Sequence, residues 1–139
     1  ISRCINFNIH LSYSKSIMVI NKILNDDIFN HINYDLINYY FSPGNIYNLL
    51  NFANSNNVDI KEMNIETFLN VFIKNNYFKK DLSFKYLLYD YIELCLKNTS
   101  INLKNNYYSY FIDKIDNLKK FNLDEESFFI EFQNKILNG

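Results

Sequence analysis

Glycine, proline and tryptophan are scarce in this chain of 139 residues, which contains two Gly, one Pro and no Trp. Glycine and proline are the main breakers of regular structure, and an all-β sandwich or barrel needs many turn residues. Their scarcity therefore favours long helices. Phe and Tyr are abundant instead, with 13 and 12 copies, and the hydrophobic share of 48% is enough for the core of one domain or two small ones.

An excess of positive charge is also missing, because the formal net charge is −1 and the lysine pairs at 79–80 and 119–120 are isolated. A nucleic-acid-binding surface normally needs a basic stripe, so we expect none on this chain. No apolar run is long enough to span a bilayer, and Asn and His interrupt the first apolar stretch, which excludes a signal peptide. We expect a cytoplasmic protein that does not contact a membrane.

The residues of common catalytic and metal sites are few. Cys4 and Cys95 form no CxxC pair, and without a secretory signal we expect both to be reduced and buried. His10 and His31 do not make a metal site by themselves. The motifs of P-loops, dinucleotide-binding turns, zinc proteases and nucleophile elbows are all absent. We therefore expect no metal, no cofactor and no catalytic centre within this chain.

The pattern of apolar residues predicts a mostly α fold with one short strand near the N-terminus. Ile5, Phe7, Ile9 and Leu11 alternate with polar residues, and this period of two is typical of a half-buried strand. A lone strand needs neighbours for its backbone hydrogen bonds. We therefore expect this chain, which begins at Ile1, to be cut from a larger protein.

After Ser12 the period becomes that of an α-helix. Helices are expected over about 14–25, 34–41 and 43–53, and Ser42-Pro43-Gly44 gives the third a good N-cap and a first-turn proline. Residues 54–57 are interpreted as a linker near a domain boundary. Further helices are expected at about 65–73, 87–95 and 107–118, and beyond a capping box of Asn122 and Glu125. The inward positions would be Ile17, Ile20, Ile23, Leu24, Ile46, Leu49, Leu50, Ala53, Ile65, Phe68, Leu69, Phe72, Ile73, Leu87, Leu88, Tyr91, Ile92, Leu94, Cys95, Phe128, Phe129, Phe132 and Ile136.

Arg3 is the only arginine, so the 14 basic residues less this one leave 13 lysines. A guanidinium is a planar fork of several donors, and it suits a phosphate group in a way that an ammonium does not. A single arginine can also be an accident of composition. The choice between these two interpretations depends on the residues around it.

Ser2-Arg3-Cys4 followed by a strand resembles the Ser-Arg-Cys motif of clamp-loader subunits in the AAA+ superfamily. The resemblance extends along the whole chain, with residues 1–56 matching the end of an AAA+ module with its three-helix lid. Residues 57–139 match the all-helical collar, mainly by their number of helices and by Phe121-Asn122-Leu123-Asp124. At the place of the sensor arginine of ATP-binding subunits the chain has Ser42-Pro43-Gly44-Asn45, which is similar to the delta-prime subunits of bacterial clamp loaders.

The resemblance implies a role in trans. Arg3 would act as an arginine finger that reaches ATP bound by a neighbouring subunit, where a guanidinium stabilises the charge developing on the phosphoryl oxygens. Ser2 and Cys4 would support this motif. The collar would hold a hetero-oligomer with the motor ATPase and delta subunits of a DNA polymerase III holoenzyme, which loads the sliding clamp onto primed DNA. The nucleotide-binding core and zinc module of the family would precede Ile1.

Three other interpretations remain open. The chain could belong to the motor ATPase subunit of the same complex, although it lacks the sensor arginine. It could be a helical interaction domain of an unrelated protein, in which Ser-Arg-Cys is a coincidence. It could also be an auxiliary helical domain of an unrelated enzyme, although no cluster of residues indicates a substrate pocket.

Overall fold

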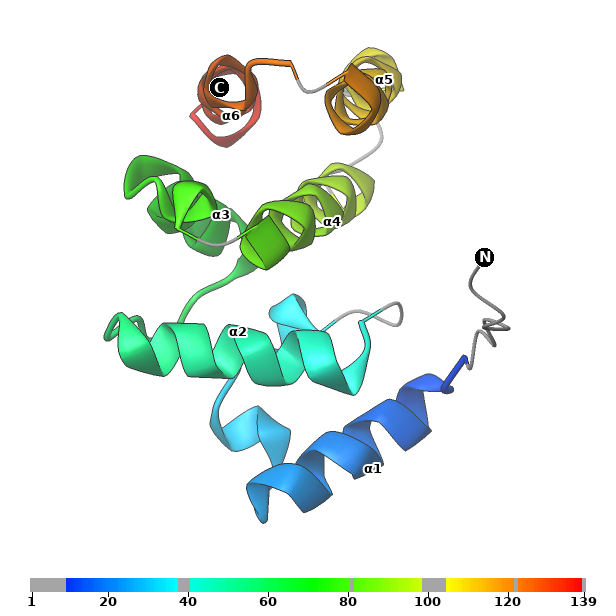
Figure 1. The fold of residues 1–139 in the computed structure, drawn as a ribbon, viewed down its shortest axis with the longest axis vertical. Helices are drawn as coiled ribbons and strands as arrows, with labels where there is room; N and C mark the ends of the chain where they lie inside the picture. Colours follow the sequence, from blue (N-terminus) through cyan, green and yellow to red (C-terminus); the bar gives the residue numbers. More distant parts are fainter. Residues whose placement is uncertain (1–9, 38–40, 81, 99–104, 122, 139) are drawn as a thin grey trace, which may run out of the picture.

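The computed structural model describes residues 10–37, 41–80, 82–98, 105–121 and 123–138, and these ranges are mostly α-helical (Figure 1). Most of the strand predicted from Ile5 to Leu11 lies outside the described residues, which begin at residue 10. The described residues contain no strand. Short 3₁₀ turns connect several of the helices. The α-helices are α1 (Tyr13–Leu24), α2 (Pro43–Ser55), α3 (Ile65–Lys74), α4 (Leu82–Asn98), α5 (Asn105–Phe121) and α6 (Glu125–Phe132). The shorter turns are η1 (Ile28–Asn30), η2 (Tyr34–Leu36), η3 (Tyr77–Lys79) and the π-helical η4 (Gln133–Leu137).

The helices are stacked in pairs along the long axis of the molecule. Figure 1 shows α1 and α2 at one end, α3 and α4 in the middle, and α5 and α6 at the other end. Helix α1 packs against α2, α3 packs against α4, and α4 continues the stack by packing against α5. Helix α4 is therefore in the centre, as its wide apolar face predicts.

Two groups of aromatic rings fill the core. The first joins α2 to α3 and α4, where the Phe52 ring lies 4.1 Å from Phe84 and 5.3 Å from Phe72, measured between ring centroids. The second joins α4 to α5 and α6, where Tyr89 stacks on Phe129 at 5.7 Å. Offset and edge-to-face pairs of this kind add stability beyond the area that they bury.

Most of the predicted inward positions are confirmed. All those predicted on α2, α3 and α6 and at Ile136 in η4 are buried, as are all those on α4 except Leu94, which is partly buried. Cys95 is buried with a free thiol, as predicted, whereas Cys4 lies outside the described residues. In α1 the prediction fails at Ile23, which is 52% exposed, while Ser16 is buried. Helix α1 packs mainly on α2 and η1, and its buried residues are Ser16 and Ile20.

The helix predicted from Tyr34 to Phe41 is wrong where the structure describes it. Only the single 3₁₀ turn η2 forms, with the Asn33 side chain accepting a hydrogen bond from the Asp35 N–H. Ile37 then adopts extended backbone angles, φ −100° and ψ 112°. Ile37 and Phe41 are nevertheless buried, so both apolar positions face the core although Ile37 is not helical.

Two helix ends also differ from the prediction. The N-cap of α6 is Asp124, whose carboxylate accepts from the backbone N–H groups of Glu126 and Ser127, and Asn122 lies outside the described residues. Asp is as good a cap as Asn, and here it lies directly before the first helical residue. The predicted linker 54–57 is also shorter, because α2 continues to Ser55.

Contacts cross the predicted domain boundary between residues 56 and 57. The Phe52 and Phe84 rings pack together, and the Lys80 ammonium donates to the side-chain oxygen of Asn56 at 3.1 Å. The division into residues 1–56 and 57–139 stays a prediction.

Candidate functional site

The predicted arginine finger and its supporting residues, Arg3, Ser2 and Cys4, lie outside the described residues. The structure does describe the other part of the clamp-loader pattern, Ser42-Pro43-Gly44-Asn45. It places this segment at the N-terminus of α2, as predicted. The candidate site built here is therefore this helix end and the pocket beside it.

The N–H groups at the N-terminus of α2 are mostly hydrogen-bonded within the chain. The Ser42 hydroxyl accepts a hydrogen bond from the Asn45 N–H at 3.2 Å, and the Ser42 carbonyl accepts one from the Ile46 N–H at 3.2 Å. Pro43 has no N–H to offer. Among the described residues, Gly44 therefore has the one N–H of the first turn without a hydrogen bond. A helix end that binds phosphate presents several free N–H groups, and this one does not.

Gly44 is not required by the local backbone of α2. A Cβ atom added at this position would meet only the Ser42 hydroxyl oxygen, at an ordinary contact distance of 3.7 Å. Gly is also a poor helix former, so its presence weakens the first turn slightly. Nothing within the described chain explains the glycine.

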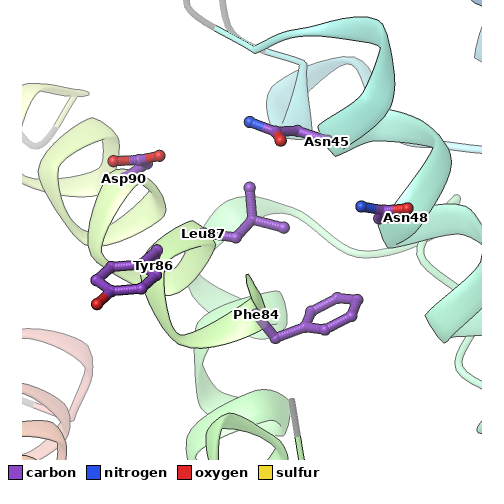
Figure 2. Close-up of a pocket in the computed structure, with 6 residues that line it drawn as sticks. All are labelled: Asn45, Asn48, Phe84, Tyr86, Leu87 and Asp90. Atoms are coloured by element: carbon purple, nitrogen blue, oxygen red, sulfur yellow. The ribbon is translucent and has the colours of Figure 1, made fainter. Parts of the chain in front are cut away.

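A pocket of about 230 Å³ lies between the first half of α2 and the first half of α4 (Figure 2). Asn45 and Asn48 extend their side-chain amides from α2 toward α4, and Leu87 lies between the two helices. Asp90 lies on α4 on the far side of Leu87. The lining residues are Asn45, Asn48, Phe84, Tyr86, Leu87 and Asp90, and none of them is a cation.

Among the described residues that line this pocket, Asp90 is the one with a charge. Burial raises the pKa of its carboxyl group, the Lys119 ammonium acts in the opposite direction, and Glu93 adds a smaller upward effect. Among the described residues, none forms a hydrogen bond or ion pair with the Asp90 carboxylate. The Asp90 side chain is itself exposed, so a donor from another molecule can reach the carboxylate.

The remaining charged clusters serve the packing of the helices. Glu131 on α6 accepts hydrogen bonds from Lys114, Lys135 and Tyr110, which ties α6 to α5 and η4. This cluster is closed by internal partners. It therefore offers no free group for chemistry.

A second cluster surrounds Tyr89. Lys85 on α4 pairs with Glu125 on α6 at 2.7 Å. The Tyr89 hydroxyl beside them is buried and has no hydrogen-bond partner among the described residues, and burial together with the nearby Glu125 carboxylate raises its pKa. A phenol of raised pKa stays neutral and does not act as a base.

The sequence does not reveal this pocket. Asn45 attracts attention only as the residue in place of a sensor arginine, and Asn48 is one of many asparagines. The available signal is Asp90, an acid between the apolar residues of α4. The pocket forms only when α2 and α4 pack together, and local patterns do not predict that contact.

No group of three His, Cys, Asp or Glu side chains within the described ranges could hold a metal ion. The helices described are all too short or too polar to cross a membrane. Comparisons of the chain with protein-family models, curated proteins and solved structures found no match.

Proposed function

We propose that the chain forms the lid and collar of a delta-prime-type clamp-loader subunit and supplies Arg3 to the ATP site of a neighbouring motor subunit. The observation that carries the proposal is Ser2-Arg3-Cys4, with the only arginine of the chain, directly before a run with strand periodicity. Arginine in this place offers bidentate recognition of a phosphate, which the 13 lysines do not.

The N-terminus of α2 supports the delta-prime type over the motor ATPase type. Asn45 occupies the place of the sensor arginine, so no cation is offered there to a nucleotide. The first turn also has its N–H groups largely occupied by Ser42, which leaves little for a phosphate. A subunit of this kind contributes to catalysis in trans and has no ATPase activity of its own.

Exposed apolar side chains near the α5–α6 connection support an assembly role. Phe121 is 67% exposed, and Leu123 and Ile130 are each about half exposed. Exposed apolar groups that form one contiguous patch are typical of surfaces that bind a partner. In the proposed complex they would be buried against neighbouring collars in a hetero-oligomer.

The decisive experiment replaces Arg3 in a reconstituted complex with its partner motor and delta subunits. Arg3→Lys keeps the positive charge but loses the planar set of N–H donors. DNA-stimulated ATP turnover should therefore fall by about 10³-fold, which is at the lower end of the range for arginine fingers. The complex should still assemble. Lys15→Arg, an exchange of cation type on exposed α1, is the matched control and should leave turnover unchanged. Unchanged ATP turnover in Arg3→Lys would contradict the assignment of Arg3 as an arginine finger.

A further inference from the structure

We infer that the pocket between α2 and α4 binds the guanidinium group of an arginine side chain from a partner protein. This inference does not rest on Arg3 or on the clamp-loader proposal. It rests on the size of the pocket, on its lining and on the charge of Asp90.

The size of the pocket suits one long side chain. Its volume of about 230 Å³ lies below the range of roughly 300–1,000 Å³ that is usual for drug-sized ligands. Phe84 and Leu87 form an apolar floor on which the methylene groups of a side chain can pack. Tyr86 is half exposed and forms the rim.

The polar groups of the pocket select a planar group with several donors. Asn45 and Asn48 enter from α2, and the Asp90 carboxylate lies across from them on α4 (Figure 2). Each amide oxygen and each carboxylate oxygen accepts N–H donors. A guanidinium has five N–H donors in one plane, so it can bond to a carboxylate and to an amide on another helix at once. An ammonium has three donors at a single point and spans this pocket less well.

The charge of the pocket favours a cation over an anion. Of the lining residues that the structure describes, Asp90 alone is charged, and Lys119, the cation whose field reaches it, forms no ion pair with it. A cation that enters the pocket gives Asp90 the partner that it lacks, whereas an anion would be repelled. Lys85 lies 5.5 Å from the centroid of the Tyr86 ring and is paired with Glu125, so Tyr86 serves as a wall and not as the main partner of the guanidinium.

The test is an NMR titration of the 139-residue chain with the blocked peptide acetyl-Ala-Arg-Ala-amide. Saturable shifts of the side-chain amides of Asn45 and Asn48 are expected. The same peptide with citrulline, which has the shape but not the charge of arginine, should bind at least about tenfold more weakly, because a hydrogen bond to a charged group is then lost. Equal binding of the citrulline peptide, or no saturable shift, would overturn the inference.

Variants of the chain make the test specific to the pocket. Asp90→Asn should lower the affinity for the arginine peptide about tenfold, and Asn48→Ala should lower this affinity by a smaller factor. Asp113→Asn, on the exposed side of α5, is the matched control and should bind as the unchanged chain does. Equal affinity in Asp90→Asn and Asp113→Asn would overturn the inference. Tighter binding of free arginine than of the blocked peptide would assign the pocket to a small molecule and overturn the choice of a protein partner.

Discussion

The Tyr91 hydroxyl donates a hydrogen bond of 2.7 Å to the backbone carbonyl oxygen of Leu36, 55 residues earlier in the chain. Both residues are fully buried. The Tyr91 ring also packs edge-on against Phe41 and at a tilt against Phe68. Burial raises the pKa of Tyr91 well above its usual value, so the hydroxyl remains a donor throughout the working pH range. This contact fixes the irregular segment after α1 onto central helix α4.

Removing this hydroxyl should destabilise the fold. Tyr91→Phe keeps the ring packing and leaves the buried Leu36 carbonyl without its partner, which costs about 1–3 kcal/mol. Urea unfolding followed by circular dichroism measures the loss. Tyr34→Phe, at a residue that is 64% exposed, is the control and should change the free energy of unfolding by less than about 0.5 kcal/mol. Equal stability of both variants would contradict the role of this bond.

The cap of α2 offers a second comparison within the same chain. Ser42 bonds to the Asn45 N–H through its side chain, whereas Ser12, the N-cap residue of α1, makes no side-chain cap bond. Ser42→Ala should therefore cost about 1 kcal/mol, and Ser12→Ala should cost clearly less. Paired unfolding curves test this difference. A larger loss from Ser12→Ala would show that the capping account is wrong.

The central ring cluster should carry much of the stability. Phe72 has no exposed surface and its ring packs against Phe52, Phe68 and Tyr77. Phe72→Ala leaves a cavity and should cost about 3–5 kcal/mol, a large share of the stability of a small protein. Ile130→Ala removes a half-exposed side chain and is the control. Thermal unfolding of the two variants should differ by many degrees, and similar midpoints would contradict the observed packing.

Glu131 should make the stability depend on acid pH. Partial burial raises the pKa of Glu131, but hydrogen bonds from Lys114, Lys135 and Tyr110 outweigh this effect and lower it to about 2 from an ordinary value of 4.5. A lowered folded-state pKa stabilises the fold above the unfolded-state pKa, so this contribution should be lost as the pH falls from about 4.5 toward 2.

The measurement is the free energy of unfolding at several pH values between 2 and 5. Glu131→Gln should flatten the decrease over this window, because the amide does not titrate. Glu62→Gln, at an exposed residue between α2 and α3, is the control and should keep the slope of the unchanged chain. If the free energy of unfolding depends on pH with the same slope in both variants, Glu131 does not cause the loss of stability in acid.

Local sequence patterns predict the fold best where a cap and an apolar face agree. Helix α2 is predicted together with its cap, since Ser42-Pro43-Gly44 marks its start and Ile46, Leu49, Leu50 and Ala53 mark its buried face. Helices α3 and α6 follow the same logic through their buried faces. These features depend on residues within one or two turns of each other, and such short-range relations can be read from sequence.

The failures come from contacts between distant segments. The apolar spacing around Ile37 and Phe41 suits a helix, but Ile37 has extended backbone angles, and Tyr91 bonds to the preceding residue, Leu36, from 55 residues away. The pocket at Asp90 has the same origin, because its two walls belong to α2 and α4. Local sequence patterns do not specify which helices pack against each other, so neither feature could be predicted.

Asparagine takes the place of glycine at the helix ends of this protein. Asn25, Asn57 and Asn76, which follow α1, α2 and α3, have positive φ values of 54°, 54° and 53°, and all three side chains are exposed. The left-handed conformation that ends each of these helices is thus adopted by an exposed residue. During divergence, the length of each helix can therefore change by substitution at a surface position while the aromatic interior stays the same.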